Sequence, residues 1–300
     1  MLNFIREAKR ITMDAIFMAK YHTPAIVPKN ILQTPEINAL ADEFRERGCI
    51  KIESEEFIET ADYLNRFYFQ KIEANNNRVN EEAFRVNDRK FSILEFNKDE
   101  YRKGGMEISA YISFMDTGIS PLILNEKLHS ILYSYYKRQH YFRNQPRIMK
   151  VDYKGKNTIY NNNMHVDHLH QVSLILNISD ITMDDTHTVY TPGSNRRSLL
   201  KQGIEMPVEK SRELVQTYKE RVHFTGSKGT LYMFDTSGFH CGDYRQGNPR
   251  KILHINFTTG HYLTALHDNP DDLVRWQQKN SKPDYVKDSF NMAINHNSKV

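Results

Sequence analysis

Short runs of β-forming residues, separated by turns, occupy most of the chain after about residue 90. Val, Ile, Tyr, Phe and Thr are frequent in these runs, and Gly, Pro, Asn and Asp gather between them. Many short strands with turn signals between them are typical of a β-sandwich or a double-sheet jelly roll. We therefore expect a mainly β core with flanking α-helices. The expected strands are 90–95, 108–114, 147–153, 172–178, 189–191, 222–225, 230–235 and 251–259, and one helix, 125–142, interrupts them.

Helical spacing dominates the chain before this region. Apolar residues recur at three- and four-residue intervals over 2–20 and over 54–73, which predicts a helix in each stretch. A further helix is predicted to begin at Thr34 and Pro35, because Thr can cap a helix and Pro suits its first position, and to stop by Gly48.

These patterns predict one domain over residues 1–300. Residues 1–89 would form a mostly helical scaffold, 90–260 a jelly-roll core, and 261–300 a C-terminal surface segment. The chain from Asn269 onward is polar and contains two prolines, so we expect this segment to wrap the surface and fray.

Charge and cysteine content narrow the classes of function. The net charge of +4 comes from 41 basic and 37 acidic residues that are mixed along the chain, so nucleic-acid binding is not expected. No uncharged apolar run reaches the roughly 18 residues that cross a bilayer, so no integral membrane segment is expected. Only Cys49 and Cys241 are present, which implies no disulfide framework and favours a cytoplasmic location. The oligomeric state cannot be predicted.

Two histidines and one carboxylate form the most informative motif. In a β-strand, side chains two residues apart share a face, so His165 and Asp167 can point into one cavity. His240 follows the strongly β-forming run 230–235 and a turn, and sheet closure can bring it alongside them. Two imidazoles and a carboxylate are the facial triad that holds non-haem Fe(II) and leaves coordination positions open.

Arg250 follows the last of these residues at the start of a β run. A planar guanidinium there can bind a carboxylate through two parallel hydrogen bonds. His254 and Asn256 lie at even spacing from Arg250 and can face the same cavity, although we expect His254 to be a satisfied core histidine.

With these residues the chain resembles the Fe(II)/2-oxoglutarate-dependent oxygenases, and most of all the phytanoyl-CoA dioxygenase-like group. The resemblance covers about residues 145–260. It rests on the His165-Val166-Asp167 motif, on His240 with Arg250, and on residues 191–195, which are similar to that group's Pro-Gly-Ser-His turn. Asn195 stands where the turn usually has His.

The resemblance implies a double-stranded β-helix, a cupin-like jelly roll. It implies Fe(II) on His165, Asp167 and His240, and 2-oxoglutarate on the metal with its far carboxylate on Arg250. Such an enzyme uses O2 to hydroxylate an aliphatic C–H bond of a small-molecule substrate, with release of succinate and CO2. A carboxylate ligand favours hydroxylation, because related halogenases have a small residue in its place. The candidates for further 2-oxoglutarate contacts are Tyr160, Thr186 and Thr188.

Two other functions stay open at this point. The cluster of His165, Asp167, His168 and His170 is similar to dinuclear zinc sites, which would make the protein a zinc-type metallohydrolase. Alternatively, the chain is a non-catalytic cupin-like binding protein that has kept the fold without the chemistry. A metallohydrolase would leave Arg250 without a role, and the presence of all three ligands and the Arg argues against a protein that has lost the chemistry.

Overall fold

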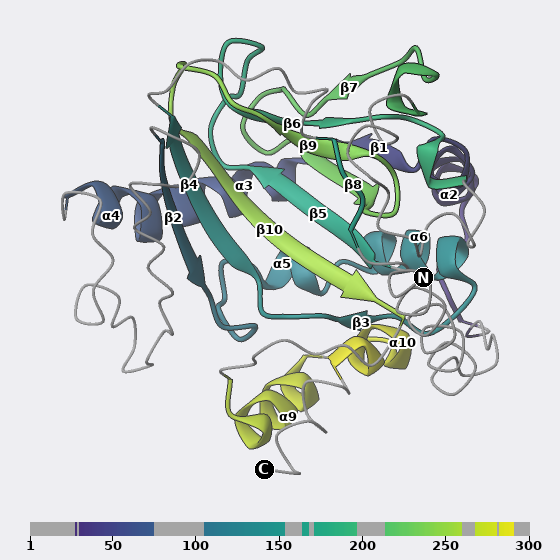
Figure 1. Ribbon diagram of the computed structural model, residues 1–300. Coiled ribbons are helices and arrows are strands. Elements are labelled where there is room, and N and C mark those ends of the chain that lie inside the picture. Colours follow the sequence, from purple (N-terminus) through teal and green to yellow (C-terminus); the bar gives the residue numbers. More distant parts are fainter. Residues whose placement is uncertain are drawn as a thin grey trace, which may run out of the picture.

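Two antiparallel β-sheets form the centre of the computed structural model (Figure 1). The structure describes residues 28, 30–74, 105–153, 164–167, 171–196, 214–259, 268–280 and 282–290. The large sheet has seven strands in the order β1-β8-β5-β10-β4-β2, with β3 also paired to β10, and the small sheet has the order β7-β6-β9. The strands are β1 (Cys49–Ile52), β2 (Gly105–Tyr111), β3 (Tyr141–Phe142), β4 (Arg147–Tyr153), β5 (Gln171–Asn177), β6 (His187–Tyr190), β7 (Val222–His223), β8 (Leu231–Asp235), β9 (His240–Asp243) and β10 (Arg250–Thr258).

Helices α3, α5 and α6 cover one face of the large sheet, and α10 lies beside β3, with α9 farther from the sheet (Figure 1). The helical elements are α2 (Pro35–Arg47), α3 (Glu55–Leu64), the π-helical turn η1 (Asn65–Phe69), α4 (Gln70–Ala74), α5 (Ser120–Ile123), α6 (Glu126–Tyr136), the 3₁₀ turn η3 (Ser194–Arg196), α9 (Pro270–Lys279), α10 (Asp284–Lys287) and the 3₁₀ turn η4 (Asp288–Phe290). Within the described part of the chain, no helix has the combined length and apolar character needed to span a bilayer.

The two faces of the large sheet carry different layers of the core. Leu174, Leu176 and Leu253 pack with the helices in the larger hydrophobic cluster. Ile175 and Ile252, one position along each strand, point to the other face and pack with side chains of the small sheet. This second layer lies between the sheets, as expected for a jelly roll.

Helix α2 forms where the sequence predicts it, for the reasons given above. The Thr34 hydroxyl accepts the Ile37 N–H at 3.2 Å, and Pro35 begins the helix. Gly48 ends it with φ 74°, a left-handed conformation in which its N–H reaches the Phe44 carbonyl at 2.8 Å. The predicted helix over 54–73 is also present, as the continuous series α3, η1 and α4.

Other boundaries differ from the prediction. The helix expected over 125–142 ends at Tyr136, because Lys137 takes a left-handed conformation (φ 55°), and residues 141–142 form β3 instead. The four-residue strands β1 and β9 were not predicted from their composition. The predicted helix 2–20 and strand 90–95 lie outside the described residues.

The expectation of a fraying C-terminal segment is wrong over 268–280 and 282–290. Asn269 caps α9 by accepting the backbone N–H groups of Asp271 (2.9 Å) and Asp272 (3.3 Å). Tyr285 and Phe290 are buried in the large hydrophobic cluster. The polar composition of this segment reflects the solvent side of an amphipathic helix whose Leu273 is buried.

Candidate active site

The backbone brings His165, Asp167 and His240 together. His165 forms an isolated antiparallel bridge with His240, in which each N–H donates to the other residue's carbonyl at 3.0 and 2.9 Å. The Asp167 N–H donates to the Thr236 carbonyl at 2.8 Å, in the turn that precedes β9. The segment 165–167 is therefore not a regular strand, but its hydrogen bonds to both ends of this turn place the two side chains on the same side.

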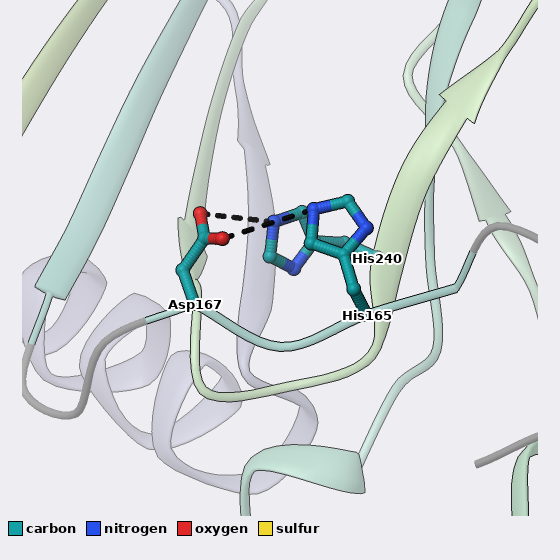
Figure 2. A group of neighbouring side chains, drawn as sticks. All are labelled: His165, Asp167 and His240. Carbon is teal, nitrogen blue, oxygen red and sulfur yellow. Dashed lines mark ion pairs between the residues drawn. The ribbon is translucent and has the colours of Figure 1, made fainter. Parts of the chain in front are cut away.

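The three side chains converge on one point (Figure 2). The Asp167 carboxylate lies beside both rings, with Oδ2 at 3.4 Å from His240 Nε2 and Oδ1 at 3.7 Å from His165 Nε2. The ring centroids are 4.6 Å apart, and one ligand-type atom of each residue lies within 4.8 Å of the others. His240 is nearly buried at 8% exposed, whereas His165 and Asp167 are 49% and 42% exposed. The group is thus buried on one side and open on the other.

A hydrogen bond to the main chain sets the tautomer of His240. Its Nδ1 lies 2.9 Å from the Gly238 carbonyl, which can only accept, so Nδ1 carries the proton. Nε2, the nitrogen that faces Asp167, is then the one left to ligate a metal, and the ring packs against Phe234 with centroids 5.3 Å apart. Histidines that bind metals are usually oriented by such a hydrogen bond from the other ring nitrogen. The donor set therefore fits a divalent metal ion.

Residues 191–195 form hydrogen bonds with the main chain just before His240. The Ser194 hydroxyl donates to the Thr191 carbonyl at 2.6 Å and accepts the Phe239 N–H at 2.8 Å. The Thr191 N–H donates to the Phe239 carbonyl at 2.9 Å. The Pro-Gly-Ser turn thus holds the residue that directly precedes His240.

Arg250 begins β10 and is buried. Its Nη2 donates to the Thr188 hydroxyl of β6 at 2.8 Å, a contact that joins the two sheets. Of the other predicted contacts for 2-oxoglutarate, Thr186 is bonded to the main chain of Arg245 instead, and Tyr160 lies outside the described residues. His168 and His170 also lie outside them.

His254 lies on the same face of β10 as Arg250. Burial lowers the pKa of His254 well below its usual range, the positive charges of Arg147 and Arg250 lower it further, and the Asp167 carboxylate acts in the opposite direction. Arg147 Nη2 lies 3.0 Å from His254 Nδ1, and since a guanidinium only donates, Nδ1 accepts. His254 is therefore a neutral, satisfied histidine, as the sequence suggested.

Further polar side chains face the space between the sheets. Asn256 is predicted there from its even spacing to Arg250, whereas Arg147 and Ser173 are not predicted. The Asn256 carbonyl oxygen accepts the Ser173 hydroxyl at 2.6 Å, and Asn144 lies 3.4 Å from its amide. Arg147 stands opposite His254 in the β4–β10 register, so it shares this face. Alternation along β10 was the signal for Asn256, whereas Arg147 and Ser173 depend on strand pairing.

Comparisons with known proteins bear on the fold. The sequence matches no family model and no curated protein. Among solved structures, it is similar to EctD from S. alaskensis with bound Fe, with a TM-score of 0.53 and 15% identity over 76% of this chain and 80% of that one. It is also similar to SnoK, a non-haem α-ketoglutarate-dependent carbocyclase from nogalamycin biosynthesis, with a TM-score of 0.50 and 12% identity over 75% of this chain and 84% of that one.

A second EctD structure, with 2-oxoglutarate and 5-hydroxyectoine, matches with a TM-score of 0.50 and 16% identity over 79% of this chain and 81% of that one. The predicted fold is thus confirmed: the chain has the jelly-roll fold of the non-haem iron, 2-oxoglutarate-dependent enzymes. At these identities the similarity shows a shared fold, and a shared fold does not by itself imply a shared function.

Proposed function

We propose that this protein is an Fe(II)- and 2-oxoglutarate-dependent dioxygenase that hydroxylates an aliphatic C–H bond of a small-molecule substrate, with release of succinate and CO2. The observation that supports this most is the convergence of His165, Asp167 and His240, in which His240 Nδ1 bonds the Gly238 carbonyl and Nε2 is directed into the group. The same arrangement lies on a fold shared with enzymes that use iron and 2-oxoglutarate. The turn at 191–195 favours the phytanoyl-CoA dioxygenase-like group within them.

The three residues would hold Fe(II) on one side, leaving positions for the cosubstrate and O2. Bound Fe(II) supplies activation of O2 coupled to the oxidation of 2-oxoglutarate. Arg250 would pair with the far carboxylate of 2-oxoglutarate, and Thr188 would hold the guanidinium in position for it. The burial of Arg250 strengthens such a pair, because water competes less for the carboxylate.

The organisation expected from the sequence is part of this proposal: one oxygenase domain over residues 1–300, with 1–89 as scaffold and 90–260 as the core. The carboxylate of Asp167 favours hydroxylation over halogenation. A small molecule is the proposed substrate, and the neutral His254 would leave the inner face positively charged through Arg147 and Arg250.

Absorption and turnover together test the proposal. Without O2, addition of 2-oxoglutarate to the Fe(II)-loaded protein should produce a weak metal-to-ligand band, and with O2 the protein should convert 2-oxoglutarate slowly to succinate. His165→Ala and Asp167→Ala should lose both signals. Asp184→Ala, which removes an exposed carboxylate from the loop before β6, should keep them.

Two outcomes would count against the proposal. Retention of zinc with no band on addition of 2-oxoglutarate and iron would favour the metallohydrolase. Succinate formation that is the same in wild type and in both triad variants, or absent from all, would favour the non-catalytic binding protein.

A further inference from the structure

A second group of metal-ligating residues lies on the small sheet. His187 of β6, His223 of β7 and Asp243 of β9 place one ligand-type atom each within 4.8 Å of the others. His187 stands directly opposite Asp243 in the β6–β9 register, and His223 stands opposite Val189, so all three share one face.

This face is turned away from the candidate active site. Thr188 and Tyr190 alternate with His187 along β6, and Tyr190 pairs with His240. His240 and the Thr188 contact to Arg250 therefore belong to the opposite face of the same sheet. The second group is separate from the triad, although it shares strands with it.

The lone pair of His187 is directed into the group. Its Nδ1 lies 2.7 Å from the Asp185 carbonyl and therefore carries the proton. Nε2 is then the acceptor of a 2.8 Å hydrogen bond from His223 Nδ1, and it lies 3.7 Å from Asp243 Oδ2. This is the same orienting device that His240 uses toward Gly238.

Asp243 supplies a buried carboxylate. Its side chain is fully buried, and its Oδ2 accepts Arg245 Nη2 at 2.8 Å and Nε at 3.1 Å. Its Oδ1 is buried too, and no residue in the described ranges donates a hydrogen bond to it. A buried carboxylate oxygen without a donor is costly, and a cation bound by this carboxylate is one way to satisfy it. The oxygen that lies 3.7 Å from His187 Nε2 is Oδ2. Carboxylates that bind metals commonly accept hydrogen bonds from neighbouring side chains, and Arg245 donates such bonds to Asp243.

We propose that His187 Nε2, His223 Nδ1 and the Asp243 carboxylate form a second metal site, for a divalent ion of the zinc class. Two nitrogens and an oxygen suit tetrahedral Zn²⁺, whose ligand bonds of about 2.0–2.1 Å put ligand atoms about 3.3 Å apart. The separations of 2.8 and 3.7 Å lie on either side of that value. A metal ion would take the place of the proton that His223 Nδ1 donates to His187 Nε2, with the His223 proton on Nε2 instead, and small side-chain shifts would complete the geometry. His223 is only half-buried, which gives an ion a path from solvent and room for a fourth ligand.

The role that follows is structural. An ion here would link β6, β7 and β9, three short strands, and β9 begins with His240. The site would therefore brace the strand that carries one member of the triad. The proposal does not depend on the proposed function, since the outer site can bind zinc whether or not the triad binds iron.

Zinc stoichiometry in four full-length proteins tests the site, measured by competition with a chromophoric chelator. The proteins are wild type, His223→Gln, the double variant His165→Ala/Asp167→Ala, and all three changes combined. We expect two bound Zn²⁺ in wild type, one in His223→Gln and in the double variant, and none in the combination. Zinc should also raise the Tm of the double variant and leave that of the combination unchanged. The proposal is overturned if the double variant binds no zinc, or if His223→Gln binds as much as wild type.

Anomalous diffraction at the zinc edge from wild-type crystals covers the case in which His223→Gln fails to fold. A peak bounded by His187, His223 and Asp243 supports the site. Zinc at the triad alone, with the contact between His187 Nε2 and His223 Nδ1 kept at hydrogen-bond length, contradicts it.

Discussion

Main-chain carbonyls two residues upstream orient the histidines of both groups. His240 donates to Gly238 and His187 to Asp185, each through Nδ1. Because Nδ1 bonds the carbonyl in each case, Nε2 is the nitrogen of each ring that is directed into its group. Local backbone geometry, which follows from strand pairing, thus decides the chemistry of each ring.

Position 238 has no room for a side chain, so it requires glycine. A Cβ there would overlap the hydroxyl of Tyr190, which is fully buried and has no free direction in which to move. We expect Gly238→Ala to displace the carbonyl that orients His240 and to weaken Fe(II) binding about tenfold, a loss on the order of 1.4 kcal/mol. Titration of Fe(II) into the apoprotein measures this. Gly193→Ala is a useful comparison for space, since a Cβ there meets nothing within 4 Å, although its φ of 74° adds backbone strain. If Gly238→Ala binds Fe(II) like wild type, the carbonyl is not needed.

Substitutions of Arg250 and Thr188 should weaken the binding of 2-oxoglutarate without changing the affinity for Fe(II). Arg250→Lys removes the planar fork, and we expect the Kd for 2-oxoglutarate to rise by about 10- to 100-fold. Thr188→Val removes one hydrogen bond, worth about 0.5–1.5 kcal/mol, so the rise should be only several-fold. The metal-to-ligand band measures both, and Fe(II) affinity should not change. Equal 2-oxoglutarate affinity in wild type and Arg250→Lys would remove Arg250 from the site.

At the scale of the element, β10 packs one face into the hydrophobic core and presents the other face to the candidate active site. Leu253 and Ile255 are buried against the helices, while Arg250 and His254 face the small sheet. The strand pairs with both β4 and β5, which fixes its register. A one-residue slip would exchange the two faces, so the packing of the core protects the position of Arg250.

A cluster of three charged side chains ties α4 to the large sheet and gives a pH-dependent prediction. Lys150 and Lys251 are cross-strand neighbours, and Glu73 bonds both, at 2.9 and 2.7 Å. Burial raises the pKa of Glu73, but the hydrogen bonds from Lys251 and Lys150 outweigh it and the pKa is lowered overall. The stabilisation is therefore present above the pKa of the unfolded chain and is lost as the pH falls through the lower folded pKa.

We expect Glu73→Gln to lower the free energy of unfolding at pH 7 by about 1 kcal/mol or less, because Glu73 is 38% exposed and water screens the pair. At a pH below the folded pKa, wild type and variant should converge. Urea denaturation at several pH values measures the difference. A constant difference across this range would mean that the glutamate acts through packing instead of charge.

At the scale of the whole molecule, the C-terminal residues complete the core. Phe290 contacts Phe114 and Phe142, with ring centroids 5.3 and 4.6 Å apart. We expect Phe290→Ala to reduce the free energy of unfolding by about 3–5 kcal/mol, the usual range for a buried Phe. Arg275→Ala, at a side chain 64% exposed, should change it by no more than about 0.5 kcal/mol. Thermal and urea denaturation compare the two. Equal stability of both variants would show that this segment is only a surface wrap.

Much of the local structure could be predicted from the sequence. Thr34, Pro35 and Gly48 mark the ends of α2, and the alternating runs predict most of the described strands, because capping and side-chain alternation act over a few residues. The short strands β1 and β9 were missed, since four residues carry little pattern and both are held by their partners. The C-terminal helices were not predicted, because the polar residues of their exposed side obscure the apolar pattern of their buried side.

The sequence by itself determined which residue types can meet: His165 and Asp167 two positions apart, His240 after a turn, and Arg250 at the head of a strand. Only the tertiary structure decided that Thr188 holds Arg250 and that His187, His223 and Asp243 share the far face of the small sheet. The physical reason is that antiparallel pairing and register join segments distant in the chain. Those contacts depend on the packing of two whole sheets, which no local run of residues specifies.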